Sequence, residues 1–436
     1  MRKIILLLLP TLFYAQDFTT LLQHAGQNLL IAAKSQEVAA KEAMLKSTES
    51  ANYPTLDAKL NAIYLKDTPT MHFRLPLPGT PPEFQVGKKP NYTGEIDISY
   101  PLFTGFAISS MIDKAQFDLQ KAKLEKRDTL RKLYMQIAAL YGNAYAIDHA
   151  IDANREAVNA VAASLKKAQG FYKAGLLAPS ELANIRAKKY EIAATLQTLE
   201  SQKRQTLQML SYLTGSGVDR TGMLPALSLP ADQTLIDEAL SKREDIRALQ
   251  KALKMDEADI RLARSGRYPT VALIGALKSQ GDSLRLNGDG YTNPNKSYIG
   301  AAVEWKLFDG FATEHRIEAA KAKRLGRILY LRDYRHRVKT DLQNDLTTLK
   351  ALQLRKEAKV AQLEAQERYY RLTKGRFANH LAGADELSRA IAARAAAKAN
   401  VEKIEAEIFI QKCKLLLQSS LERFQRALDM RKESDG

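Results

Sequence analysis

Histidine and cysteine are the side chains that most often bind metal ions, and this chain has few of them. The histidines show no metal-ligand spacing with acids or with Cys413; they stand at positions 24, 72, 149, 315, 336 and 380. Surface or packing roles are therefore favoured over metal binding. A lone cysteine excludes an intrachain disulfide framework, and Cys413 lies in a helical pattern, so we expect it to be a packed small side chain.

Two further clusters resemble ligand sites only superficially. Gly215-Ser-Gly217 with Gly222 has glycines suited to a phosphate loop, but it follows a helical pattern rather than a strand, which favours a helix-ending linker. The other cluster could suggest calcium, but its spacing matches no calcium loop and is more typical of an exposed turn; it consists of Asp282, Asn287, Asp289 and Asn293. We therefore expect no catalytic residues, no cofactor and no metal, and the protein is not predicted to be an enzyme.

The formal net charge of +17 raises the question of nucleic acid. The basic residues are spread along helical patterns and interleaved with acids, so a solvated face is favoured and we expect no nucleic-acid partner. Ile4 to Tyr14 form an apolar run preceded by Arg2 and Lys3, too short for a membrane helix. This segment predicts a signal peptide over residues 1–15 and an exported protein.

A duplication organises the chain. Tyr100-Pro-Leu-Phe-Thr-Gly-Phe106 returns as Trp305-Lys-Leu-Phe-Asp-Gly-Phe311, at a shift of 205 residues. Further upstream the shift is 215, where Tyr53-Pro-Thr falls on Tyr268-Pro-Thr. Such matching predicts two equivalent structural units. We place them at residues 16–214 and 232–428, with a linker at 215–231 and a tail at 429–436.

Each repeat is predicted to contain two strands, because the apolar residues recur at every second position. Examples are Leu56, Ala58 and Leu60, which alternate with Asp57 and Lys59. The predicted strand pairs span residues 53–103 and 268–308. Each strand is assigned one apolar and one polar face, although the strand that starts at Tyr268 alternates poorly. Between the first two strands, residues 67–90 hold six prolines and predict a long exposed loop without regular structure.

Long helices account for most of the remaining sequence. Residues 17–51 have apolar side chains at spacings of three and four and predict one helix. After each strand pair, residues 107–169 and 312–374 contain one glycine each and no proline, which predicts rods of roughly 95 Å. Each rod turns and returns, so long helical hairpins are expected over residues 105–214 and 310–428. The fold class is therefore mainly α with a small β part.

Four amphipathic strands per chain favour an outer membrane, where the apolar face can meet lipid and the polar face can line a lumen. Four strands cannot close around a lumen, so several copies must contribute. Aromatic residues at the strand ends nearest the helices fit a membrane-interface girdle, or alternatively seal a soluble strand-helix junction; they are Tyr53, Tyr100, Phe103, Tyr268, Trp305 and Phe308.

With its signal peptide, duplicated Tyr-Pro-Thr strand starts, paired junction motifs and helical hairpins, the chain resembles the TolC family of outer-membrane efflux proteins. The resemblance implies a homotrimer with a twelve-stranded transmembrane β-barrel in outer-membrane lipid and an α-helical coiled-coil barrel extending into the periplasm. It also implies a periplasmic adaptor (membrane fusion protein) and an inner-membrane pump of RND or ABC type as partners. The linker and the C-terminus would form an equatorial girdle.

In that family the far helical turns constrict the periplasmic entrance and meet the adaptor. Residues matched to the turns, or charged and clustered there, are Gly175, Glu181, Arg186, Arg376, His380, Asp385, Glu386 and Arg389. Glu386 has an alternative interpretation as a first-turn acid favoured by the helix dipole. We hypothesise that charge pairs and hydrogen bonds between neighbouring turns hold the entrance closed.

The predicted function is an outer-membrane exit duct of a tripartite efflux or type I secretion system. The alternative is a periplasmic coiled-coil scaffold or adaptor without a channel.

Overall fold

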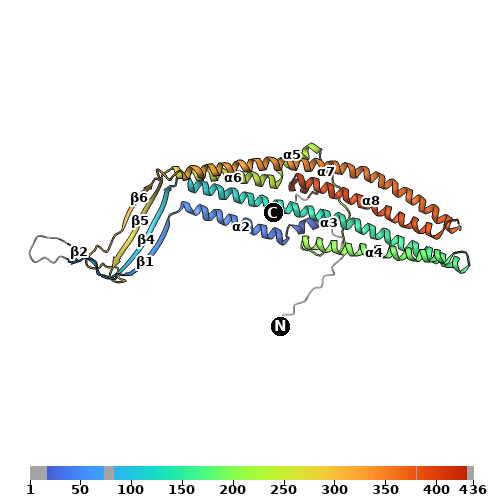
Figure 1. The fold of residues 1–436 in the computed structure, drawn as a ribbon, viewed down its shortest axis with the longest axis horizontal. Coiled ribbons are helices and arrows are strands. Elements are labelled where there is room, and N and C mark those ends of the chain that lie inside the picture. The colour runs from blue at the N-terminus through green and yellow to red at the C-terminus, as the bar shows by residue number, and fades with distance from the viewer. Residues whose placement is uncertain (1–16, 73–82, 380, 430–436) are drawn as a thin grey trace, which may run out of the picture. The chain divides into compact units, whose positions relative to one another are not determined.

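The computed structural model describes residues 17–72, 83–379 and 381–429, and its chain divides into two compact units (Figure 1). The sheet unit contains Ala39–Lys121 and Gln250–Tyr330. The helical unit contains the described residues up to Val38, Ala122–Leu249 and those from Leu331 onward. Both units take residues from both halves of the chain. The repeat boundaries at 214 and 232 therefore stay a prediction about the duplication. The predicted signal peptide and most of the predicted tail lie outside the described residues.

One antiparallel sheet of four strands forms the β part, in the order β1-β4-β5-β6 (Figure 1). Its strands are Thr55–Tyr64 (β1), Pro90–Phe103 (β4), Thr270–Gly281 (β5) and Tyr298–Glu304 (β6). The central ladder between β4 and β5 joins the two sequence repeats. Each of the outer strands, β1 and β6, has a strand partner on one side among the described residues.

The register places most of the large apolar residues of the four strands on one face of the sheet, whereas Ile63 and Ile274 lie on the other. Leu56 is opposite Ile98, Ile96 is opposite Leu277, and Val271 is opposite Val303. Most of these side chains are exposed; Leu60 and Leu277 expose 66% and 61% of their surface. The sequence prediction of one apolar and one polar face per strand thus extends to a continuous apolar face across the sheet.

Two details of the strand prediction were wrong. The segment 67–90 is not wholly irregular, because Thr70–His72 (β2) pairs with Glu83–Gln85 (β3). The last strand ends at Glu304, four residues before the predicted end. In the first repeat the corresponding residues pair only with β5, since the β1 ladder ends where Thr55 faces Ser99.

The helices carry most of the chain, as the sequence predicts. Their bounds are Phe18–Ala25 (α1), Leu29–Glu49 (α2), Ala107–Lys173 (α3), Pro179–Thr214 (α4), Asp232–Lys242 (α5), Glu244–Arg264 (α6), Ala312–Ala378 (α7), Ala384–Ser419 (α8) and Leu421–Ala427 (α9). The two longest, α3 and α7, have 67 residues each, or about 100 Å of helix. Each precedes a turn and a return helix, α4 or α8, of 36 residues.

The predicted helix over 17–51 is instead two helices, and the reason lies far along the chain. Asn28 accepts a hydrogen bond from the Leu30 N–H and donates through Nδ2 to the Leu213 carbonyl, at 2.7 and 2.8 Å. The side chain therefore starts α2 and attaches it to the end of α4. The second predicted helical hairpin, over 310–428, also breaks before its end, because Ser420 is extended and its Oγ caps α9 by accepting from the Arg423 N–H at 3.1 Å.

Aromatic rings form the centre of the helical unit. Phe18 of α1 is fully buried, and its ring centroid lies 5.0 Å from that of Tyr141 and 5.2 Å from that of Phe409. Phe424 of α9 adds a third ring at 6.3 Å. This cluster joins α1, α3, α8 and α9 through one side chain, and aromatic pairs in such geometry add stability beyond their buried area.

Replacing Phe18 by alanine should destabilise the helical unit by about 3–5 kcal/mol, because the truncation leaves a cavity among three rings. Thermal unfolding in detergent, followed by circular dichroism, measures this loss. Phe18→Leu is the graded control, since it keeps most of the buried volume and should lose less. Equal losses for the two variants would contradict the packing explanation.

A partly buried ion pair attaches α5 to α9. Glu238 accepts from Arg423 Nε at 2.6 Å and from Lys242 Nζ at 3.0 Å. Burial alone would raise the pKa of Glu238, but these two cations lower it from 4.5 to about 2. The contribution of Glu238 to stability is therefore complete above its unfolded pKa of 4.5 and lost as the pH falls towards 2.

Glu238→Gln should accordingly lower stability at neutral pH, by an amount on the order of 2 kcal/mol. The difference from the unchanged protein should shrink between pH 4.5 and about 2, where the wild-type carboxylate becomes protonated. Melting temperatures across that range test the prediction. The neighbouring exposed Asp237→Asn serves as the control and should change little. A pH-independent difference for Glu238→Gln would contradict the assignment.

Candidate functional site

Two helical turns, between α3 and α4 and between α7 and α8, contain the residues matched to an entrance. A backbone hydrogen bond recurs in both: the Leu176 N–H donates to the Phe171 carbonyl and the Leu381 N–H to the Arg376 carbonyl, each at 2.8 Å. Gly175 is left-handed with φ +75°, which suits glycine. The duplicated sequence therefore forms the same chain reversal twice. His380 lies outside the described residues.

Apolar packing holds the two turns together from beneath. The rings of Phe171 and Phe377 have centroids 5.8 Å apart, so the ends of α3 and α7 meet. Small and apolar side chains from all four helices continue this packing: Ala153, Ala157, Val161, Ala168, Ile185, Ile192, Phe377, Ala384, Leu387, Ile391 and Ala395. The many alanines permit close approach of the helices, as in coiled coils.

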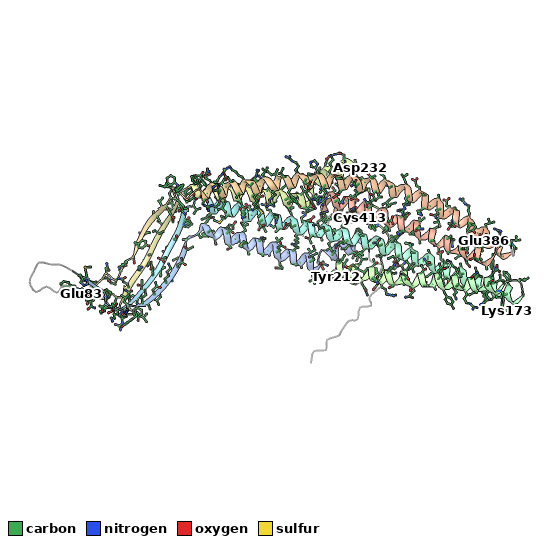
Figure 2. The ribbon with its side chains drawn as sticks, viewed as in Figure 1. Glu83, Lys173, Tyr212, Asp232, Glu386 and Cys413 are labelled. Atoms are coloured by element: carbon green, nitrogen blue, oxygen red, sulfur yellow. The ribbon has the colours of Figure 1, made fainter. Side chains whose placement is uncertain are left out.

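The charged side chains of the second turn are paired with one another. Arg376 Nη1 lies 3.2 Å from Glu386 Oε1, and its Nη2 donates to the Leu381 carbonyl at 3.1 Å. Arg389 Nη2 lies 3.1 Å from Asp385 Oδ2, one helical turn back. Lys173 and Glu386, labelled in Figure 2, belong to the first and second turn respectively. Both ion pairs therefore join residues of the second turn to each other.

The first turn contributes differently. Glu181 lies in the first turn of α4, and a Cβ placed on Gly383 would be 3.7 Å from its Oε1. Glu181 therefore borders the second turn. Arg186 is exposed on α4 and stands apart from these contacts. The structure therefore places Glu181 beside Gly383 of the second turn, whereas Arg186 lies on an exposed part of α4.

The strand-to-helix junctions repeat as closely as the turns. Gly105 and Phe106 have φ of +60° and +70°, and Gly310 and Phe311 have φ of +67° and +64°. A left-handed phenylalanine is uncommon, so its recurrence at the same place indicates one conserved local geometry. In each junction the phenylalanine stacks edge-on with the one three residues earlier, at 5.3 and 5.5 Å between centroids.

The predicted interface aromatics lie at these junctions, in the sheet unit. Tyr53, Tyr100, Tyr268, Trp305 and Phe308 are exposed and Phe103 is half-buried. Trp305 Nε1 donates to the Arg267 carbonyl at 3.2 Å, which fixes the polar end of the ring. The assignment of these six rings to a membrane-water boundary stays a prediction.

The other candidate ligand residues are in structural roles. Asp289 accepts from the N–H groups of Tyr291 and Thr292 at 2.9 Å, as in a turn, and Asp282 pairs with Lys88. Gly215 ends α4 with φ +69°. Cys413 is fully buried, and burial raises the pKa of its thiol. No three His, Cys, Asp or Glu side chains of the described residues are grouped to hold a metal ion.

A buried ionic cluster of the helical unit was missed by sequence reasoning. Arg131, only 1% exposed, donates from Nε to Asp128 at 2.9 Å and lies 3.4 Å from Asp245. Burial raises the pKa of Glu244. Burial would also raise that of Asp245, but Arg243 and Arg131 lower it overall. These residues have ordinary helix spacing, and the sequence carried no signal that they are buried together.

Comparison with known proteins identifies the chain's relatives. The model of the family described as outer membrane efflux protein matches residues 21–216 and 235–415. The chain belongs to this family. It is therefore an outer-membrane efflux channel with a mainly helical fold. Curated protein sequences give no match. Among the described residues of this efflux protein, the helices are too polar or too short to cross a membrane.

Solved structures of outer-membrane channels share the fold of this efflux protein. VceC from Vibrio cholerae has a TM-score of 0.74 and 16% identity, covering 92% of this chain and 95% of that chain. CmeC from Campylobacter jejuni has a TM-score of 0.76 and 14% identity, covering 92% and 85%. MtrE from Neisseria gonorrhoeae, solved in an open state, has a TM-score of 0.71 and 17% identity, covering 92% and 88%.

If the Arg376–Glu386 pair restrains the turns of this efflux protein, Arg376→Glu should raise the open fraction of the channel. An exposed ion pair contributes up to about 1 kcal/mol, so the expected increase is at most about fivefold for each copy. Single-channel recording in a planar bilayer measures the effect.

Two controls accompany this measurement. The charge swap Arg376→Glu with Glu386→Arg should return the open fraction towards its original value. Arg371→Glu makes the same charge change at an exposed site on α7, away from the pair, and should alter it little. An increase that is equally large for Arg371→Glu would indicate a general charge effect.

Proposed function

We propose that three copies of this chain form a passive exit duct, whose barrel in the outer membrane is completed by trimerisation. The observation that carries the proposal is the four-stranded sheet with an exposed apolar face and two outer strands, β1 and β6, that each have one strand partner among the described residues. Backbone groups at a sheet edge cannot remain unpaired in hydrocarbon. Three copies supply twelve strands, an even number within the usual range for outer-membrane barrels.

The two faces of the sheet suit lipid and water respectively. On the polar face, Lys59 Nζ lies 2.7 Å from Asp97 Oδ2, and Lys278 Nζ lies 3.0 Å from Glu95 Oε2. Ionic pairs of this kind are compatible with an aqueous lumen and costly in lipid. The opposite face is apolar from β1 to β6, as the register shows. The apolar face is therefore assigned to the lipid.

The helical unit supplies the periplasmic part of the proposed duct. The two turns are the proposed entrance and the docking surface for a periplasmic adaptor, which connects the duct to an inner-membrane pump of RND or ABC type. The paired charges Arg376, Glu386, Asp385 and Arg389 offer such a partner alternative ion pairs. The proposed duct itself carries out no reaction, and the pump supplies the energy.

Reconstitution tests the duct directly. The purified protein is placed in a planar lipid bilayer, and chemical crosslinking of the same sample counts its chains. Discrete conductance steps from a species of three chains are expected. A detergent-free soluble species without conductance would contradict the proposal and leave the helical hairpins as a scaffold.

Adjacent residues on opposite faces sharpen the test. Leu60→Arg puts a charge on the proposed lipid face, where it costs about 2–4 kcal/mol for each copy near the middle of the membrane. Asn61→Arg puts the same charge on the proposed lumen face. The first variant should fail to insert stably, whereas the second should insert and conduct cations less well. Equal insertion of both variants would argue against the face assignment.

A further inference from the structure

The ladder between β4 and β5 is an interface between the two repeats within one chain. In it the second strand of repeat one pairs with the first strand of repeat two, and Pro101 faces Ala272. The outer strands are the equivalents of β4 and β5 in the other repeat: β6 is the second strand of repeat two, and β1 is the first strand of repeat one. A neighbouring copy can therefore continue the sheet by repeating the β4–β5 interface as β6–β1.

The duplication fixes the register of that repeated interface. Lys306 corresponds to Pro101 at the shift of 205, and Asp57 corresponds to Ala272 at the shift of 215. Lys306 of one copy should therefore face Asp57 of the next. By the same correspondence from Ser99 and Ile274, Glu304 should face Lys59.

Charge supports this register independently of the duplication. In this register each pair, Lys306 with Asp57 and Glu304 with Lys59, combines a basic and an acidic side chain. A slip of two residues in one direction sets Glu304 against Asp57, and in the other direction sets Lys306 against Lys59. Like charges directly opposite are destabilising, and a slip of one residue would reverse the apolar face.

The strand-to-helix junctions differ in the same way: the junction of the first repeat is packed against a neighbouring segment and the junction of the second is open. A Cβ on Gly105 would lie 2.7 Å from the Ser265 carbonyl oxygen and 2.9 Å from Tyr268 Cβ, so this glycine packs against the start of β5. At Gly310, the corresponding residue, no atom of the described chain other than those of its immediate chain neighbours lies within 4 Å of such a Cβ. The surface equivalent to Ser265 and Tyr268 is Ser50 with Tyr53, and Tyr53 is 67% exposed.

Ring contacts repeat this argument. Phe106 stacks edge-on with Tyr268 at 5.5 Å between centroids. Its counterpart Phe311 is 62% exposed, and Tyr53 is also largely exposed. A second copy that places Tyr53 against Phe311 would bury both rings. It would also supply the partner strand that β6 needs to continue from Glu304 to Phe308, as β4 continues from Ser99 to Phe103.

We propose that β6 of one copy pairs antiparallel with β1 of the next in one register, with Glu304 opposite Lys59 and Lys306 opposite Asp57, and with Gly310 and Phe311 seated on Ser50 and Tyr53. The inference rests on the proposed duct and specifies how its copies recognise one another. The partner is a second copy of this chain, and the two charge pairs select the register.

Disulfide trapping measures the register. Val303→Cys is combined with Leu60→Cys, its opposite residue in the proposed register. Ala302→Cys with Asn61→Cys tests the next pair, because only one of two consecutive antiparallel pairs has the shorter Cα separation. The native Cys413 is buried in the helical unit and stays unchanged.

Slipped pairs serve as matched controls. Val303→Cys with Ala58→Cys and Val303→Cys with Ala62→Cys use the same face, but each sets the thiols about 7 Å apart along the strand. Mild oxidation in the membrane should convert at least one proposed pair to covalently linked copies on denaturing gels. The slipped pairs should crosslink at least tenfold less.

The outcomes separate this inference from the proposed function. Preferential crosslinking of a slipped pair, or conductance without crosslinking of any pair, would overturn the register and leave the duct intact. A monomer that neither conducts nor crosslinks would remove both.

Charge exchange provides a second measurement without cysteine. Lys306→Glu and Asp57→Lys should each lower the temperature at which the oligomer dissociates, because each sets like charges opposite one another, and the double exchange should restore it. Additive losses in the double variant would count against the pairing.

Discussion

Backbone hydrogen bonding in a membrane is the constraint on which the rest of this molecule depends. A sheet that meets hydrocarbon needs a closed ladder, and each chain supplies four strands whose outer members, β1 and β6, have one strand partner each among the described residues. In the proposed duct, other copies close the ladder. Because of the duplication, one chain already contains an example of the proposed interface between copies, in the pairing of β4 with β5. The proposed contact between copies has the same strand geometry as the contact between β4 and β5, and it uses their equivalents β6 and β1.

The strand-to-helix junctions have the same backbone geometry in both repeats. Each uses a glycine and a phenylalanine in succession with positive φ, followed by a capped helix of 67 residues. Thr104 and Asp309 cap the two helices from corresponding positions, by accepting from the N–H groups of Ile108 and Thr313. Strand ends and helix starts are therefore joined in the same way in both repeats.

Sequence reasoning succeeded where structure is encoded locally. Period-two alternation predicted the strands and their apolar face, and the absence of proline predicted α3 and α7. It failed where the determinant is distant. The break before α2 depends on Asn28 bonding to Leu213, and the cluster around Arg131 forms only when α3 meets the start of α6. The β2–β3 hairpin formed within a proline-rich segment, because short pairing tolerates prolines outside the paired residues.

The end of β6 differs from the prediction for a related reason, and it shows what a single chain lacks. The residues beyond Glu304 have the same alternating pattern as their counterparts in β4, yet only the latter form a strand. The alternating sequence is therefore compatible with a strand, but a strand forms only where a partner strand is present. In the first repeat that pairing comes from β5, an inner neighbour. In the second repeat, the proposed contact with β1 of a neighbouring copy would supply that pairing and lengthen β6.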